Sequence, residues 1–259
     1  MTEVGFMRAT RPRAVRGAAI GLALALVSSP STLRAQRSVE GNTIHSPELP
    51  DAALRVDPSL EHIGAERFVL YGVADVELHV FVEAEGDRVQ RLLWVQFEGF
   101  RDDNDRTYDY TSDPTVEIEG RPFHVNARFY PPSGFAGRPG SDGDRAARLL
   151  RERGLELGPA LGRVRLVWLL NDPPRDELMM IYVEDLARHG LDLETLERDE
   201  ARWEALREEL IERAAASFEI VSGRAGGQSA VRNTSKVPEN AGRGAASSPA
   251  SSSTQTFTR

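Results

Sequence analysis

The 259-residue chain contains no cysteine. Without cysteine the protein can form no disulfide, can use no thiolate nucleophile, and has no N-terminal cysteine that could carry a lipid anchor. Its stability must therefore come from the burial of an ordinary hydrophobic core. A chain of this length can bury such a core without covalent cross-links.

Lysine is almost as scarce, because Lys236 is the only one and the other 31 basic residues are arginines. Residues 36–221 hold 38 acidic residues against 22 arginines, a net charge of −16. A body this acidic repels phosphate backbones. We therefore expect no nucleic-acid partner.

Catalytic signatures are missing as well. The five histidines are scattered, and no His-x-x-x-His spacing typical of a zinc site occurs. The chain also lacks a Gly-x-Ser-x-Gly nucleophile elbow, a phosphate-binding loop and a dinucleotide fingerprint. The sequence thus identifies no cofactor and does not establish whether the protein is an enzyme.

Long apolar runs are limited to one uncharged stretch of eleven residues, 17–27, which follows a cluster of arginines. This pattern predicts a cleaved secretory signal over residues 1–35, too short to span a bilayer after maturation. We expect a soluble periplasmic or secreted protein with no transmembrane span once the signal is removed. The alternative is a buried N-terminal helix. Translation could begin at Met1 or at Met7.

Composition divides the rest of the chain into three parts. Residues 36–64 are polar and rich in proline, which predicts an extended lead-in. Residues 65–221 carry the periodic apolar patterns of a folded α+β domain. Residues 222–259 are rich in glycine, serine and alanine with almost no large apolar side chain, which predicts a disordered low-complexity tail.

The stretch 67–100 organises the domain. Its even positions between 68 and 82 are mostly apolar, and several odd positions are polar, so the period of two predicts a strand with one buried face. A tight turn at Glu85-Gly86 would pair it with a second strand, Val82 lying opposite Val89.

Two more hairpins are predicted, over 116–130 and over 163–185. Helices are expected after Ser141 and over 192–217, where apolar residues recur at helical spacing. The fold class expected is therefore α+β, a single mostly antiparallel six-stranded sheet made of three successive hairpins, with two helices packed on one face. The third hairpin is apolar on both faces, which is typical of central strands that are covered on both sides.

One row of polar residues forms the candidate site. Asp75, Glu77 and His79 alternate along the first strand, and the expected pairing brings Gln96 and Glu98 beside them. Carboxylates and an imidazole so placed could bind a ligand, hold a metal or act as acid and base. The alternative is a solvated outer sheet face. The candidate ligand-binding residues are Tyr71, Asp75, Glu77, His79, Trp94, Gln96, Glu98, His124 and Tyr130.

Two loops could contribute. Asp103, Asp105 and Asp109 alternate with other residues in an acidic loop and supply oxygen ligands that calcium accepts, although the spacing departs from an EF-hand. The alternative is a plain acidic connection. Residues 131–143, rich in glycine and proline, could close over a pocket as a lid or serve only as a connector.

Three functions are consistent with these patterns. The first is a module that binds a small apolar or amphipathic ligand on the semi-polar sheet face. The second is an envelope-associated module in which an apolar face pairs with a protein partner. The third is a metal-dependent hydrolase that uses Asp75, Glu77 and His79. Neither the ligand nor the oligomeric state follows from the sequence.

Overall fold

The computed structural model describes residues 37–222. The predicted signal segment and the predicted tail after Ser222 lie outside this range and stay predictions. Within it, eleven strands form two antiparallel sheets, one of four strands and one of seven. The predicted single six-stranded sheet is therefore wrong.

The four-stranded sheet has the order β1-β2-β3-β11. Its strands are β1 (Ser38–Glu40), β2 (Thr43–Ser46), β3 (Ala52–Val56) and β11 (Phe218–Ser222). Three of the four come from residues 36–64, where only an extended lead-in was expected. These strands are three to five residues long, too short to give a clear alternating pattern.

The seven-stranded sheet has the order β4-β5-β6-β10-β9-β8-β7. Its strands are β4 (Glu61–Leu70), β5 (Ala74–Glu85), β6 (Arg88–Phe100), β7 (Thr115–Ile118), β8 (Arg121–Tyr130), β9 (Leu161–Leu169) and β10 (Asp176–Asp185). All ten residues of β10 are buried, in the middle of the sheet. This confirms that the third hairpin is central and covered on both sides.

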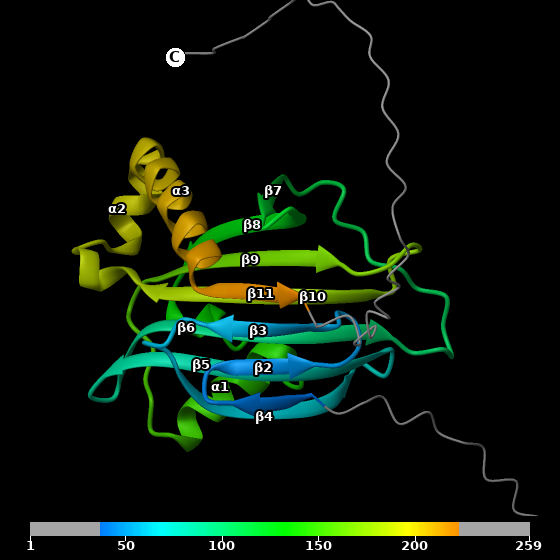
Figure 1. The fold of residues 1–259 in the computed structure, drawn as a ribbon. Helices are drawn as coiled ribbons and strands as arrows, with labels where there is room; N and C mark the ends of the chain where they lie inside the picture. The colour runs from blue at the N-terminus through cyan, green and yellow to red at the C-terminus, as the bar shows by residue number, and fades with distance from the viewer. Residues whose placement is uncertain (1–36, 223–259) are drawn as a thin grey trace, which may run out of the picture.

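The helices lie on opposite sides of the seven-stranded sheet, so the prediction that both pack on one face is wrong. Figure 1 shows the four-stranded sheet and α3 (Glu200–Ala216) in front of the larger sheet and α1 (Asp142–Glu152) behind it. A sheet with apolar side chains on both faces needs cover on both. The short α2 (Leu193–Arg198) precedes α3, and two 3₁₀ turns, η1 (Pro132–Gly134) and η2 (Leu186–His189), complete the chain.

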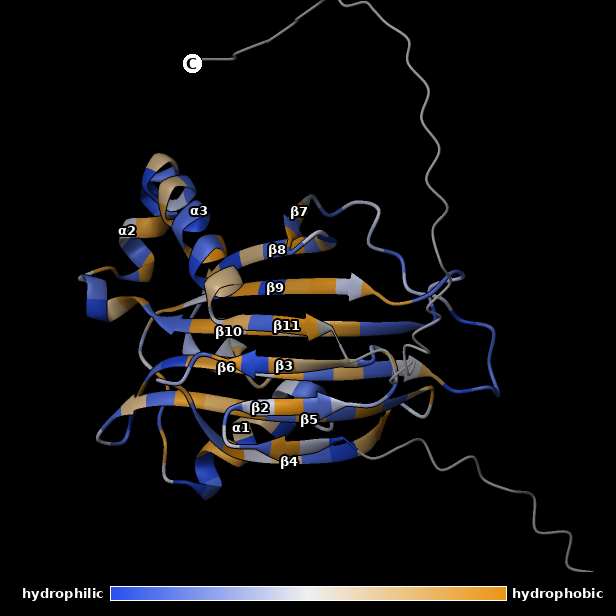
Figure 2. Ribbon diagram, in the orientation of Figure 1, coloured by the Kyte–Doolittle hydropathy of each residue, from blue (hydrophilic) through white to orange (hydrophobic). Residues whose placement is uncertain are grey.

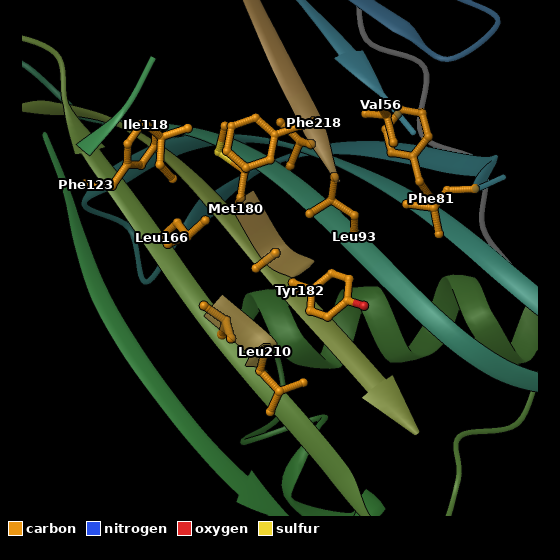
Figure 3. Packing of buried hydrophobic residues seen from close by; sticks show 14 of the residues in the cluster. Val56, Phe81, Leu93, Ile118, Phe123, Leu166, Met180, Tyr182, Leu210 and Phe218 are labelled. Atoms are coloured by element: carbon orange, nitrogen blue, oxygen red, sulfur yellow. The ribbon is translucent and has the colours of Figure 1, made fainter. Parts of the chain in front are cut away.

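Two large cores follow from this three-layer arrangement, beside a small cluster of Leu70, Ala74 and Val76. The larger lies between the four-stranded sheet with α3 and the front face of the larger sheet, and contains Phe81, Leu93, Tyr182, Leu210 and Phe218 (Figure 3). The second lies between the rear face and α1. Orange and blue segments alternate along several strands in Figure 2, as expected where neighbouring side chains enter different environments.

No helix within residues 37–222 is both long enough and apolar enough to span a bilayer.

Candidate ligand pocket

The first hairpin determines which side chains share a face. Its two turn residues are Gly86 and Asp87, because Glu85 pairs with Arg88, so the turn lies one residue later than predicted. A β-bulge then shifts the register, and Val82 lies opposite Leu92 instead of Val89. The observed pairing differs by three residues from the prediction, which reverses the faces.

The predicted polar row is consequently divided between the two sides of the sheet. Leu78 pairs with Gln96 and Val76 with Glu98, so both polar residues of β6 face α1. Glu77 and His79 belong to the other face, under the four-stranded sheet, where His79 contacts Phe97.

Glu77 and His79 form a buried ion network. The Glu77 carboxylate is 3.3 Å from Arg37 Nη1, 3.0 Å from Arg67 Nη2 and 3.1 Å from His79 Nε2. Burial alone would raise the pKa of Glu77, but these hydrogen bonds and the charge of Arg37 lower it to about 2. Arg37 also donates to the backbone carbonyls of Glu48 and Leu49. The network therefore joins the start of the four-stranded sheet to the larger sheet.

A cavity of about 430 Å³ lies on the face that α1 covers. Its floor consists of side chains from β6, β9 and β10, including Trp94, Met179 and Ile181. The loop after β6 and the segment 131–143 form its walls. A volume of this size is typical of a site for a small organic ligand.

Aromatic side chains form part of the lining, beside polar and charged groups. Six of them face the cavity: Tyr71, Trp94, Tyr108, Tyr110, Tyr130 and Phe135. Trp94 and Phe135 meet edge to face with ring centroids 6.2 Å apart, and Tyr108 stacks on Phe100 at 4.3 Å. Aromatic walls offer a large apolar contact area, and the tyrosine hydroxyls add hydrogen-bonding groups.

A chain of hydrogen bonds runs along one wall. Trp94 Nε1 donates to Gln96 Oε1 at 3.1 Å, and Gln96 Nε2 donates to Glu98 Oε2 at 2.7 Å. The Tyr108 hydroxyl donates to the other Glu98 oxygen at 3.0 Å. These hydrogen bonds fix the orientation of the Glu98 carboxylate at one end of the cavity.

Glu177 lies directly across from Glu98 on the neighbouring strand. Its side chain is 2 % exposed, and its Oε2 atom has no hydrogen-bond partner. Burial, followed by the negative charge of Glu98, raises the pKa of Glu177 to about 8, although Tyr110 and Arg165 favour the charged form. Burial also raises the pKa of Glu98. The pair therefore retains a proton at neutral pH and can both donate and accept hydrogen bonds.

Two arginines of β9, Arg163 and Arg165, also line the cavity. Arg165 donates to Asp113 at 2.8 Å and lies over the ring of Tyr110. Arg163 donates to Asn126 Oδ1 at 3.0 Å. Burial and the nearby charges of Arg128 and Arg165 lower the pKa of Arg163.

The segment 131–143, considered above as a lid or a connector, lines the cavity. Phe135 is buried against the pocket floor, and Arg138 donates to the Tyr71 hydroxyl at 2.9 Å across the rim. Gly143 brings this segment close to α1, because a Cβ there would lie 2.6 Å from the Phe135 carbonyl oxygen. The segment is therefore packed as a wall of the pocket.

The metal candidates lie elsewhere. Asp103 is near Arg101 at 3.7 Å, and Asp109 accepts from Thr111. Within residues 37–222, no three histidine, aspartate or glutamate side chains are close enough together to hold a metal ion. Asp75 is exposed and meets Arg101 at 3.4 Å, whereas Glu77 and His79 are buried.

Of the predicted ligand-binding residues, Tyr71, Trp94, Glu98 and Tyr130 line the cavity. Gln96 supports it through hydrogen bonds, and His124 packs against Tyr110 at a centroid distance of 5.6 Å. Since His79 is on the opposite face, His79 and His124 do not share a site. Five further lining residues were not predicted from the sequence: Glu177, Tyr108, Tyr110, Arg163 and Arg165. For Glu177, Arg163 and Arg165 the sequence did carry a signal, because each is a charged residue within an otherwise apolar central strand.

Comparison with protein-family models, with characterised proteins and with solved structures finds no match to this chain.

Proposed function

We propose that this protein binds a small amphipathic molecule in the pocket between the seven-stranded sheet, α1 and the segment 131–143. The observation that carries the proposal is an aromatic-lined cavity with a carboxyl pair, the half-buried Glu98 and the buried Glu177, at one end. Concave apolar sites with a few converging polar groups are the usual form of a small-molecule site.

The polar groups support binding because they leave hydrogen-bonding capacity unused. Glu177 Oε2 has no partner although it is buried, and such an atom costs free energy until a hydrogen-bonding group reaches it. A ligand with a hydroxyl or amine group would satisfy it while its apolar part contacts Trp94 and Phe135. Export to the periplasm or the medium is part of the proposal.

The other two hypotheses gain no support from the described residues. Of the residues proposed for a hydrolase, Glu77 and His79 are buried in an ion network with Arg37 and Arg67, and the exposed Asp75 pairs with Arg101. For a protein-interaction surface, the large apolar side chains exposed within residues 37–222 are only Leu49, Val69 and Tyr71. Three side chains do not form a patch of the size typical of such a surface.

Titration with the neutral fluorescent probe N-phenyl-1-naphthylamine tests the proposal. We expect saturable binding at one site per chain, weakened about tenfold or more by Trp94→Leu because the aromatic wall is lost. The matched control is Trp168→Leu, which makes the same change in the other core, where Trp168 packs near Phe123. Equal effects of the two substitutions, or no saturable binding by the unaltered protein, would contradict the proposal.

A further inference from the structure

Arg163 is a half-buried cation in the pocket lining that has no acidic partner among residues 37–222. Its Nη2 donates to a neutral acceptor, Asn126 Oδ1, and its Nε atom is buried without any hydrogen-bond partner. Arg165, two residues along the same strand, has Asp113 at 2.8 Å. The protein therefore neutralises the charge of Arg165 but not that of Arg163.

The surroundings of Arg163 add positive charge. Arg128 is its cross-strand neighbour on β8, and Arg165 also acts on it through space. Tyr130 and Asp142 act in the opposite sense, but Asp142 forms no ion pair with it, and one Asp142 oxygen already accepts from the Gly143 N–H. A partly desolvated guanidinium in this setting costs free energy that a bound anion would recover.

The acidic end of the pocket is distant from this cation. Arg163 lies opposite Val183 on β10, and Glu177 is six residues earlier on that strand. Because a β-strand rises about 3.3 Å per residue, the Cα atoms of Val183 and Glu177 are roughly 20 Å apart. An anionic group at Arg163 would therefore meet less repulsion from Glu98 and Glu177 than one placed beside them, although Asp142 also lines the pocket.

We propose that the ligand carries an anionic head group, a carboxylate or a phosphate monoester, that binds to Arg163, while its hydrocarbon part lies along Trp94 and Phe135 toward the carboxyl pair. This inference rests on the proposed function and specifies the class of ligand. The planar guanidinium presents two parallel N–H donors, which match both kinds of head group.

Displacement of bound N-phenyl-1-naphthylamine by three probes of equal chain length tests the inference. These are octanoate, octyl phosphate and the neutral 1-octanol. We expect one or both anions to displace the dye at concentrations about tenfold or more below that of octanol, because a charge-assisted hydrogen bond contributes that much. The anion that displaces the dye at the lower concentration identifies the head group.

Substitution locates the charge. In Arg163→Met the anions should no longer displace the dye at lower concentrations than octanol does. Arg163→Lys, which keeps the charge and the fold but loses the paired donors, should retain a reduced preference. Arg202→Met, an exposed residue of α3 on the other side of the sheet, removes the same charge and should leave the preference unchanged.

The outcomes separate the two proposals. If octanol displaces the dye as well as the anions do, or if Arg163→Met keeps the preference for anions, the inference fails while the proposed function stands. If neither the dye nor octanoate binds, as measured directly by calorimetry for octanoate, both fail. Circular dichroism of each variant verifies that the fold is retained.

Discussion

At the scale of single residues, the pocket is defined by polar groups placed where apolar ones would be more stable. Glu177 is in the central strand of the sheet and is buried, and Arg163 is on the adjacent strand. Substituting such groups by apolar residues of similar volume often stabilises a protein. Their presence is therefore better explained by ligand binding than by stability.

Glu177 should make stability fall as the pH rises. The folded protein holds the Glu177 proton up to about pH 8, whereas the unfolded chain releases it near the ordinary value of 4.5. Its stabilising contribution is complete below the unfolded pKa and is lost as the pH rises through the folded one. In Glu177→Gln the free energy of unfolding should therefore decline less steeply with rising pH.

Urea unfolding measured at intervals between about pH 5 and about pH 9 checks this prediction. Glu208→Gln, at an exposed position of α3, is the control and should keep the decline of the unaltered protein. A decline that is equally steep in Glu177→Gln would show that Glu177 is ionised in the folded protein.

At the scale of elements, α3 is held against the larger sheet by close contact with β9. A Cβ built on Gly162 would lie 2.8 Å from Leu210 Cδ1 and 2.9 Å from Leu186 Cδ2, so a larger residue there would have to displace these two leucine methyls. Leu210 is fully buried at this contact. The leucine side chains therefore pack directly on the backbone of β9 at this point.

Gly162→Val should destabilise the protein by about 1–3 kcal/mol, even though valine favours strands, because the added methyl groups overpack the contact. Chemical denaturation measures this change in the free energy of unfolding. If the mechanism is correct, the cost of adding Gly162→Val to Leu210→Ala should be smaller than its cost alone. Additive costs in the double variant would contradict a shared contact.

Several elements were predictable from local pattern, and the faces of the first hairpin were not. The helix that begins after Ser141, with the Ser141 hydroxyl accepting from the Asp144 N–H, matches its capping signal. The hairpin over 116–130 and the central third hairpin also formed as expected. The β-bulge beside Gln90 left no signal, because the apolar residues Val89, Leu92 and Val95 are consistent with either register.

At the scale of the whole molecule, the four-stranded sheet is what the sequence analysis missed. Its strand β3 pairs with β11, so Val56 meets Phe218 across more than a hundred intervening residues. Local periodicity carries no information about such a pairing. The same limitation applies to the pocket, because its aromatic residues come from separate loops and strands and only the folded sheet brings them together.

The four-stranded sheet should be necessary for folding. Ile44, Leu54 and Val56 are buried in the larger core, and β11 has no other strand to pair with. A chain trimmed to residues 57–222 should therefore lose cooperative thermal unfolding, whereas residues 36–222 should keep it. A sharp transition in the shorter chain would contradict the three-layer arrangement.

The emission of Trp94 tests the central claim most directly. Trp168→Phe together with Trp203→Phe leaves Trp94 as the only tryptophan, and it lines the pocket. We expect saturable changes in its emission on titration with octanoate, which does not itself fluoresce, and none in a protein that retains only Trp168, on the opposite face. A response confined to Trp168, or no response at saturating octanoate, would contradict a ligand site between the sheet and α1.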